Sequence, residues 1–290
     1  MEIKAIAPWF GGKRTLGTTI AAEFGDHRAY WGICCGSLAV EFAKVPASME
    51  VCLDLHGDLT NLAFVLQDED SAVELYGRIN RTLLSREIFL QSSKVIRNEC
   101  PPAGEAPRDV DRAFHYFITS WCGRNGVAGT SNYNGGFCMR YTKNGGHAAT
   151  RFTSAVESIP DWHQRLRGIT IVRGNIFDHL PRIEDANGVV IYVDPPYLKK
   201  GAKYLHDFVE SDHVRLATEL RRFKRTRVVV SYYDEPELCE LYPGWTKRRL
   251  KAVKSLINQG MRDAGESVEA PEVLLINGPS LVEASSSDLF

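Results

Sequence analysis

Short apolar runs alternate along the chain with segments of helical periodicity. Five of these runs have the length and composition of buried strands. They span residues 28–33, 49–55, 168–174, 189–193 and 227–233. Helical periodicity follows at residues 37–45, 57–67, 212–224 and 235–242. Strands that are apolar throughout are typical of parallel sheets with helices on both faces. The pattern therefore predicts an α/β fold with a doubly wound, Rossmann-like sheet.

The last two apolar segments depart from this alternation. Residues 246–254 and 271–277 both read as strands, and no helical periodicity separates them. Parallel strands need a long crossover connection, usually a helix, whereas antiparallel strands do not. These two segments therefore predict an antiparallel hairpin at one edge of the sheet.

A long middle segment interrupts the alternation of strands and helices. It shows helical periodicity near residues 70–97 and 108–121, followed by a loop-like run over 122–152. That run is rich in Gly, Asn, Thr, Tyr and Arg, a composition typical of exposed loops that carry function. The expected division is a core of residues 1–67 and 168–290 and a smaller inserted domain of residues 68–167.

Composition excludes some classes of protein. No apolar run reaches the roughly 18 residues of a membrane span, and the first residues lack the layout of a signal peptide. The seven cysteines are odd in number and form no C-x-x-C pair, which argues against a disulfide framework or a zinc site. We expect a cytoplasmic monomer with reduced thiols, no metal and no membrane contact.

Charge is distributed unevenly, although the net charge is only −1. Residues 221–227 and 246–254 are strongly basic, whereas residues 67–74 are acidic. A local basic face neutralises phosphates, which makes Arg248 and Arg249 candidate contacts to nucleic acid. The alternative is ordinary solvated helix and strand surface, and charge alone does not decide between the two.

The clearest chemical signal follows the apolar run 189–193. Asp194, Pro195, Pro196 and Tyr197 come directly after it. Two prolines cannot extend a sheet ladder, because each lacks an N–H and has a fixed φ. The strand is therefore expected to end at Asp194. A structural turn seldom requires these four residues together, so we interpret them as a functional site.

These four residues suit an exocyclic amine of a nucleic-acid base. Such an amine is a poor nucleophile, because its lone pair is delocalised into the ring. The Asp194 carboxylate and the rigid Pro195 carbonyl can both accept its hydrogens, which localises the lone pair and stabilises the charge that develops during attack. Tyr197 can stack on the base, which must first be flipped out of the duplex.

Other candidates fall where strands of the predicted sheet end. Gly36 follows the first strand, and Asp54 ends the next one at a spacing typical of an acid that binds a ribose. Near the N-terminus, PWFGGKR places Gly11, Gly12 and Lys13 before a helix, as in an anion-binding seat. Each has a bland alternative: a simple turn for Gly36, a helix cap or surface acid for Asp54, and chance for the glycine–lysine segment.

Several motifs in this order resemble one family, the Dam-like DNA adenine-N6 methyltransferases of the D12 class. The resemblance covers nearly the whole chain and is closest to phage- and prophage-borne members. The motifs that carry it are PWFGGKR, CGSLAVEFAK, DLHGDLTNLAFVLQD, WCGRNGVAGT, DPPY, VVVSYYDEPELCELYPGW and APEVLLINGP.

The resemblance implies a site-specific enzyme with S-adenosylmethionine as methyl donor and an adenine in double-stranded DNA as acceptor. It implies that Trp9 and Lys13 contact the donor and that Asp54 binds its ribose. Asp194 would face both the donor and the catalytic pocket. Asn175 stands where relatives often carry an aspartate beside the donor's adenine, and its amide can still accept a hydrogen bond.

The inserted segment would then be the target-recognition region. Arg124 and Asn125 precede the loop 131–143, and Arg and Asn are the side chains that pair with guanine and adenine edges. Tyr133 would fill the gap that a flipped base leaves, and Arg140 would contact DNA nearby. For Arg124 and Asn125 the alternative is that they bind buried carbonyls where the insert meets the core.

One departure from the family pattern keeps a second hypothesis open. Relatives usually carry an acid, Pro and Phe where this chain has Gly32, Ile33 and Cys34. That acid normally holds the donor's ammonium group, so its loss raises the alternative of a DNA-binding relative with weak or no activity. Two other classes of enzyme fit the four residues from Asp194 to Tyr197 less well. They are a methyltransferase acting on RNA or on cytosine N4 and a nicotinamide-dependent oxidoreductase.

Overall fold

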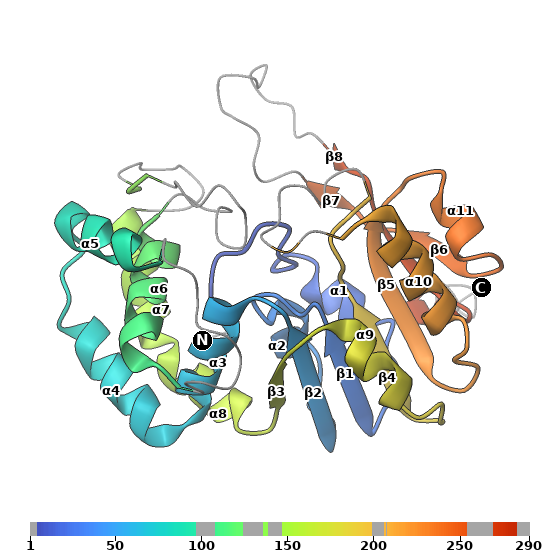
Figure 1. Cartoon of the computed structure of the whole chain (residues 1–290), viewed down its shortest axis with the longest axis horizontal. Helices are drawn as coiled ribbons and strands as arrows, with labels where there is room; N and C mark the ends of the chain where they lie inside the picture. The colour runs from blue at the N-terminus through green and yellow to red at the C-terminus, as the bar shows by residue number, and fades with distance from the viewer. Residues whose placement is uncertain are drawn as a thin grey trace, which may run out of the picture.

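The computed structural model describes residues 5–96, 108–123, 136–138, 147–198, 206, 208–253 and 269–282. A seven-stranded sheet forms the centre, in the order β3-β2-β1-β4-β5-β9-β6 (Figure 1). Its strands are β1 (Ala29–Ile33), β2 (Met49–Asp54), β3 (Thr170–Arg173), β4 (Val189–Val193), β5 (Arg227–Tyr233), β6 (Thr246–Arg249) and β9 (Glu272–Ile276). A short separate ladder pairs β7 (Ala252–Val253) with β8 (Glu269–Ala270).

The strand directions confirm the predicted α/β sheet and its antiparallel edge. Strands β3, β2, β1, β4 and β5 are parallel to one another, and β9 is antiparallel to both β5 and β6. The chain leaves β1 toward β2 on one side, whereas β4 and β5 lie on the other side. The carboxyl ends of β1 and β4 therefore form the switch point at which an open α/β sheet binds ligands.

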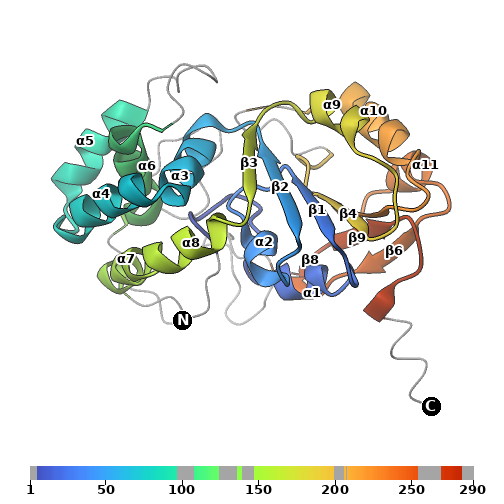
Figure 2. The ribbon, with the colours of Figure 1, turned by 90° about the horizontal axis from the view of Figure 1, so that it is seen from below.

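Helices cover both faces of the sheet (Figure 2). One face is covered by α1 (Gly17–Ala21) and α2 (Ala39–Ala43). The other face is covered by α9 (Ile176–His179), the 3-10 helix η1 (Leu180–Arg182), α10 (Glu210–Leu220) and α11 (Leu238–Leu241). Each face has its own apolar cluster, and all five residues of β4 are buried between them. This double cover explains the continuous apolar run.

Six helices form a region beside the β3 edge of the sheet (Figure 1). They are α3 (Gly57–Gln67), α4 (Glu69–Asn80), α5 (Arg86–Ile96), α6 (Val110–Cys122), α7 (Ala148–Glu157) and α8 (Ile159–Leu166). Their apolar residues join the same cluster that covers one face of the sheet. A buried ion pair between Asp58 of α3 and Arg112 of α6 holds two helices of this region together. The predicted domain division stays a prediction.

The loop-like run predicted over 122–152 is wrong at its C-terminal end. Residues 148–152 begin α7, whose His147 side chain caps the helix by accepting a hydrogen bond from Ala149 N at 3.2 Å. Phe152, Ala155 and Val156 lie on one face of α7 and are buried, so tertiary packing decides against the loop composition. No described helix is long and apolar enough to cross a bilayer.

Candidate active site

The turn after β4 is held against the neighbouring strand. The strand ends at Val193, one residue before the expected Asp194, and the Asp194 N–H donates to the carbonyl of Ile33 at 3.1 Å. The Asp194 carboxylate accepts a hydrogen bond from Lys13 Nζ at 2.9 Å through Oδ2. The Tyr197 hydroxyl lies 3.3 Å from Oδ1 of the same carboxylate. The backbone bond to Ile33 and the Lys13 side chain therefore fix the orientation of Asp194.

Lys13 joins the two strongest motifs of the sequence, although they lie 181 residues apart. Its ammonium group donates to the Gly11 carbonyl at 2.8 Å and sits 5.0 Å above the centre of the Tyr197 ring. The Lys13 side chain is buried, and its partner Asp194 is only partly exposed. The glycine–lysine segment is thus part of the same site as the turn after β4, rather than a chance occurrence of these residues.

Asp54 lies at the end of β2, on the other side of the switch point. Its carboxylate accepts hydrogen bonds from Gly36 N and His56 N, each at 2.8 Å. Gly36 has a positive φ of 49°, and a Cβ there would lie 2.7 Å from Nε1 of Trp9. Only glycine fits beneath Trp9. The cap of α3 is His56 and not Asp54, so this aspartate is free of the structural role considered for it.

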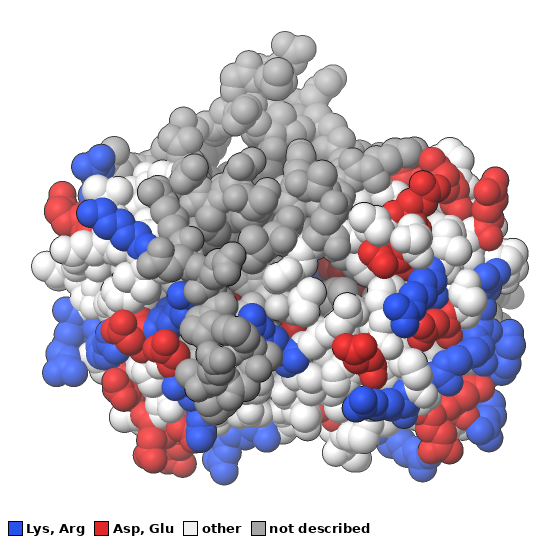
Figure 3. Space-filling model, in the orientation of Figure 1, with Lys and Arg blue, Asp and Glu red and all other residues white. Residues whose placement is uncertain are grey.

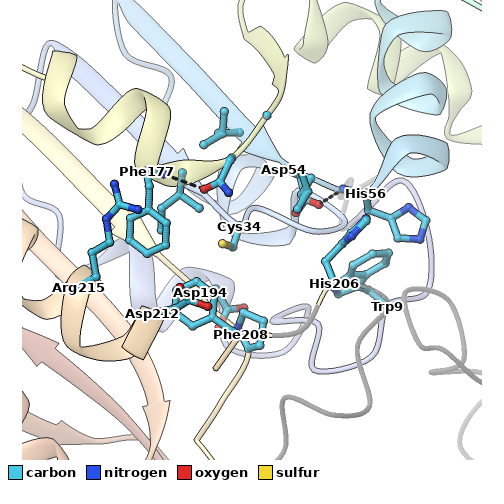
Figure 4. Close-up of a pocket in the computed structure, with 16 residues that line it drawn as sticks. Trp9, Cys34, Asp54, His56, Phe177, Asp194, His206, Phe208, Asp212 and Arg215 are labelled. Atoms are coloured by element: carbon cyan, nitrogen blue, oxygen red, sulfur yellow. Dashed lines mark hydrogen bonds between the residues drawn. The ribbon is translucent and has the colours of Figure 1, made fainter. Parts of the chain in front are cut away.

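A cavity of about 240 Å³ lies between these two acids. Figure 4 shows Asp54 and Asp194 on different sides of it, with Cys34 between them. Asn175 lines the cavity, and its side-chain oxygen caps α9 by accepting from Phe177 N at 3.0 Å. Its amide NH₂ is therefore the part of the side chain that can donate to a ligand. The remaining lining includes Trp9, His56, His206, Phe208, Asp212 and Arg215.

Burial and charge shift the protonation equilibria of this site. Burial raises the pKa of Asp194 to about 6, although the Lys13 charge and its hydrogen bond act in the opposite direction. Burial lowers the pKa of Lys13, but the charges of Asp194 and Glu272 outweigh it, so that pKa is raised overall. Burial also raises the pKa of Asp54, despite its hydrogen bonds from His56 and Gly36. Asp194 therefore titrates closer to neutral pH than an ordinary aspartate.

A carboxyl group occupies the space beside Gly32, where the resemblance led us to expect an acid in the chain itself. A Cβ on Gly32 would lie 2.5 Å from Oε1 of Glu41, which belongs to α2. Oε1 accepts a hydrogen bond from the Tyr30 hydroxyl at 2.9 Å, while Oε2 is buried without a hydrogen-bond partner. Burial raises the pKa of Glu41 to about 7. Gly32 thus makes room for a neighbouring carboxyl group.

The predicted contacts to DNA are only partly placed. Arg124, Asn125, Tyr133 and Arg140 lie outside the described residues, and they stay predictions. The side chain of Arg248 is 12% exposed and binds Glu23 at 2.8 Å, a placement that argues against a phosphate contact.

Arg249, the next residue along β6, points the other way. Its side chain is 80% exposed and binds Asp234 at 2.9 Å. On the side seen in Figure 3, described basic and acidic residues are interspersed over most of the surface, and acidic ones gather at the upper right.

Sequence reasoning missed several residues of the site, most notably Glu272. This residue begins β9, is buried, and accepts a hydrogen bond from the Tyr197 hydroxyl at 2.6 Å. The antiparallel direction of β9 was the available signal. The first residue of an antiparallel strand lies at the carboxyl ends of its parallel neighbours. Among the described residues, no group of three or more His, Cys, Asp and Glu side chains could hold a metal ion.

Comparisons with known proteins bear on this site. The family model described as D12 class N6 adenine-specific DNA methyltransferase matches residues 9–256. No curated protein matched the sequence.

Two solved structures are similar at low identity. One is precorrin-6y C5,15-methyltransferase from Geobacter metallireducens GS-15, with 8% identity and a TM-score of 0.37 over 91% of this chain and 85% of that chain. The other is SMU.472, a putative methyltransferase complexed with SAH, with 12% identity and a TM-score of 0.25 over 69% of this chain and 54% of that chain. TM-scores this low do not support a fold assignment, so we assign the fold from the strand order alone.

Proposed function

The chain belongs to the D12 class of N6 adenine-specific DNA methyltransferases, and we propose that Asp194, Pro195, Pro196 and Tyr197 hold its target adenine. The methyl donor is S-adenosylmethionine, as membership of the family implies. The base would be flipped out of double-stranded DNA to reach the turn after β4. One observation carries the proposal: this turn, Lys13 and the cavity meet at the switch point of the sheet.

The residues around the cavity fit the donor. Asp54 uses two of its roughly four lone-pair positions on backbone N–H groups, which leaves two for ribose hydroxyls. The amide of Asn175 would meet the donor's adenine, and Trp9 would pack on the donor over Gly36. Lys13 and the backbone of Gly11 and Gly12 would bind its carboxylate end. Trp9, Asp54 and Asn175 line one cavity, and Lys13 binds Asp194, which lines the same cavity; this placement supports the assignments.

The protein's own part in the reaction is positioning and electrostatics. Bound S-adenosylmethionine supplies an electrophilic methyl group on a sulfonium sulfur. The Asp194 carboxylate and the Pro195 carbonyl accept the two hydrogens of the adenine amine, which frees the nitrogen lone pair to attack. The new N–C bond forms as the C–S bond breaks, and the electron pair of the broken C–S bond stays on sulfur. With a pKa of about 6, Asp194 can accept the proton that the amine then loses.

The rival hypothesis of a weakly active DNA binder depended on the missing acid at Gly32. The Glu41 carboxyl group occupies the space into which a side chain at position 32 would extend, so glycine there has a packing reason and need not mean lost activity. A pure binder would also have no need for the backbone bond and the Lys13 contact that orient Asp194. The active enzyme is therefore better supported. A cytoplasmic location, a monomeric state and the basic contacts to DNA stay predictions.

The test is to incubate the protein with S-adenosylmethionine and mixed-sequence duplex DNA and to map methylated adenines by sequencing. We expect N6-methyladenine within one short word. Asp194→Ala should lower the rate by at least about 10²–10³-fold, the effect of removing one preorganised electrostatic group. The variant should still fold and bind DNA with near wild-type affinity, while its melting temperature falls because the buried Lys13 loses its partner. Methylation of cytosine or RNA, or a fully active Asp194→Ala, would contradict the proposal.

A further inference from the structure

Glu272 lies inside the proposed catalytic site but has no role in the mechanism so far. It is the first residue of β9 and pairs in register with Tyr233 at the end of β5. Its backbone carbonyl accepts from Leu250 N at 2.8 Å, which fixes the strand at this point. The residue is 7% exposed, and its side chain is directed at Tyr197.

The Tyr197 hydroxyl has two carboxylates within reach and only one hydrogen to donate. Its oxygen lies 2.6 Å from Oε2 of Glu272 and 3.3 Å from Oδ1 of Asp194. The first distance is that of a strong O–H···O⁻ bond, and the second is beyond the usual range for such a bond. The hydrogen is therefore directed at Glu272. Oδ1 of Asp194 keeps its lone pairs, while Oδ2 is bound by Lys13.

We propose that Glu272 is a positioning residue that binds the Tyr197 hydroxyl and so keeps Oδ1 of Asp194 open for the amine of the target adenine. Without this acceptor the hydroxyl would turn to Asp194 and compete with the amine for the same oxygen. The tyrosine ring is held at the same time by the edge of Tyr233, with ring centres 4.7 Å apart. The inference rests on the proposed function and deepens it.

Glu272 also acts on Asp194 through its charge. Its carboxylate is one of the influences that raise the pKa of Asp194, after burial and against the charge of Lys13. The other titratable groups around Asp194 come from α2, the segment after β1, β4, β5 and the turn itself: Glu41, Cys34, Tyr192, Tyr232, Tyr233 and Tyr197. Replacing Glu272 by an uncharged residue should therefore lower the pKa of Asp194.

The simpler explanation is that Glu272 is only a buried acid whose hydrogen bond stabilises the fold. Two variants distinguish this from positioning, because they separate the acceptor from the charge. Glu272→Gln retains an oxygen that can accept from Tyr197 but removes the charge. Glu272→Leu removes both with little change in volume. Tyr197→Phe removes the hydroxyl that would compete for Asp194 and keeps the ring.

We would measure kcat, KM for S-adenosylmethionine and the pH–rate profile for Glu272→Gln, Glu272→Leu, Tyr197→Phe and the Glu272→Leu/Tyr197→Phe double variant. Glu272→Leu should lose at least about tenfold in kcat, the size of one hydrogen bond to a charged group, with KM for the donor unchanged. The double variant should regain part of that loss, because it has no hydroxyl to occupy Asp194. Glu272→Gln should retain most of kcat and shift the acid limb of its profile to lower pH.

The outcomes separate this inference from the proposed function. A wild type that methylates no adenine contradicts the function itself. If the wild type is active, the inference is overturned when Glu272→Leu keeps full kcat or when the double variant is no faster than Glu272→Leu. Should Glu272→Leu fail to fold, Glu272→Ala and its double variant with Tyr197→Phe take its place, with the same two outcomes overturning the inference. Circular dichroism melting of each variant provides the control for folding.

Discussion

Two acids of this protein, Asp194 and Glu23, lie in clusters of similar composition and behave in opposite ways. The Asp194 cluster contains Lys13, Asp194, Tyr197 and Glu272 at the carboxyl ends of the strands. The Glu23 cluster contains Glu23, Arg227, Arg248, Ser280 and Leu281, where α1, β5, β6 and the segment after β9 meet. Both place charge inside the protein, which is costly unless the charge is paired.

The Glu23 carboxylate is surrounded by donors. Arg227 and Arg248 bind it at 2.9 and 2.8 Å, the Ser280 hydroxyl donates at 2.6 Å, and Leu281 N donates at 2.9 Å. Burial raises the pKa of Glu23, but these hydrogen bonds and charges outweigh it, and the pKa is lowered overall. All of the carboxylate's capacity is used within the fold.

The Asp194 carboxylate accepts fewer hydrogen bonds than the Glu23 carboxylate. One oxygen is bound by Lys13, and the other faces a hydroxyl that is directed elsewhere. Burial therefore prevails, and the pKa rises to about 6. An acid with every lone pair bound has nothing left for a ligand, whereas an acid with an open oxygen in a cavity has. This contrast separates a structural cluster from a catalytic one.

The largest expected effect is on stability. Glu23→Ala leaves two arginines without their partner, and breaking a buried ion pair in this way costs about 3–5 kcal/mol. Urea unfolding monitored by circular dichroism should show this loss, while kcat below the melting temperature stays unchanged. The matched control is Glu74→Ala, since Glu74 is an exposed acid with only a 3.8 Å contact to Arg78. It should cost less than about 1 kcal/mol.

A loss of methylation in folded Glu23→Ala, at a temperature well below its midpoint, would remove the distinction between the two clusters. A loss of stability no larger than that of Glu74→Ala would contradict the structural role of Glu23.

The pH dependence should separate the two acids by sign. The pKa of Asp194 is raised to about 6, so its protonation contributes stability that is present below about pH 4 and is lost as the pH rises through about 6. The pKa of Glu23 is lowered, so its contribution is present above its ordinary value and is lost as the pH falls below it. Activity needs ionised Asp194, and kcat/KM should fall about tenfold per pH unit below about pH 6.

Urea unfolding from pH 4 to 7 tests the sign, with Asp194→Asn as the comparison because the amide does not titrate. The wild type should lose stability relative to this variant as the pH rises through about 6. Equal slopes for both proteins, or an acid limb of the rate profile well below this pH, would show that Asp194 titrates as an ordinary aspartate.

Much of the fold was predictable, because its strands are marked by local patterns. The runs at 189–193 and 227–233 coincide with β4 and β5, and the helix at 57–67 coincides with α3. Proline chemistry fixed the end of β4 in the same way. Helices α7 and α8 were missed because polar and glycine-rich composition describes exposure, whereas their apolar faces are specified by contacts with α6 and α3.

Less of the site was predictable, because its residues meet only through tertiary structure. The four residues after β4 could be recognised from their two adjacent prolines. Their partner Glu272 lies in a strand whose sequence carries no such signal. The Glu41 carboxyl group beside Gly32 comes from another element, so a comparison of the first-strand motif position by position does not reveal it. Arg248 and Arg249 look alike in sequence. Their alternation along β6, with one side chain turned inward and the next outward, separates their roles.

The smallest expected effect concerns this last pair. Arg249 binds Asp234 at the surface, a contact worth about 0–1 kcal/mol that a DNA phosphate can replace. Arg249→Ala should therefore weaken DNA binding and reduce the slope of log K against log salt by about 0.9, the contribution of one phosphate contact. Arg248→Ala is the matched control in the same strand. Because Arg248 belongs to the Glu23 cluster, it should lower the free energy of unfolding and leave the salt slope unchanged. Fluorescence anisotropy with a labelled duplex over a range of salt concentrations measures both slopes. Equal slopes for Arg249→Ala and the wild type would assign Arg249 to ordinary solvated surface, and a reduced slope in Arg248→Ala would place the phosphate contact on the other face of β6.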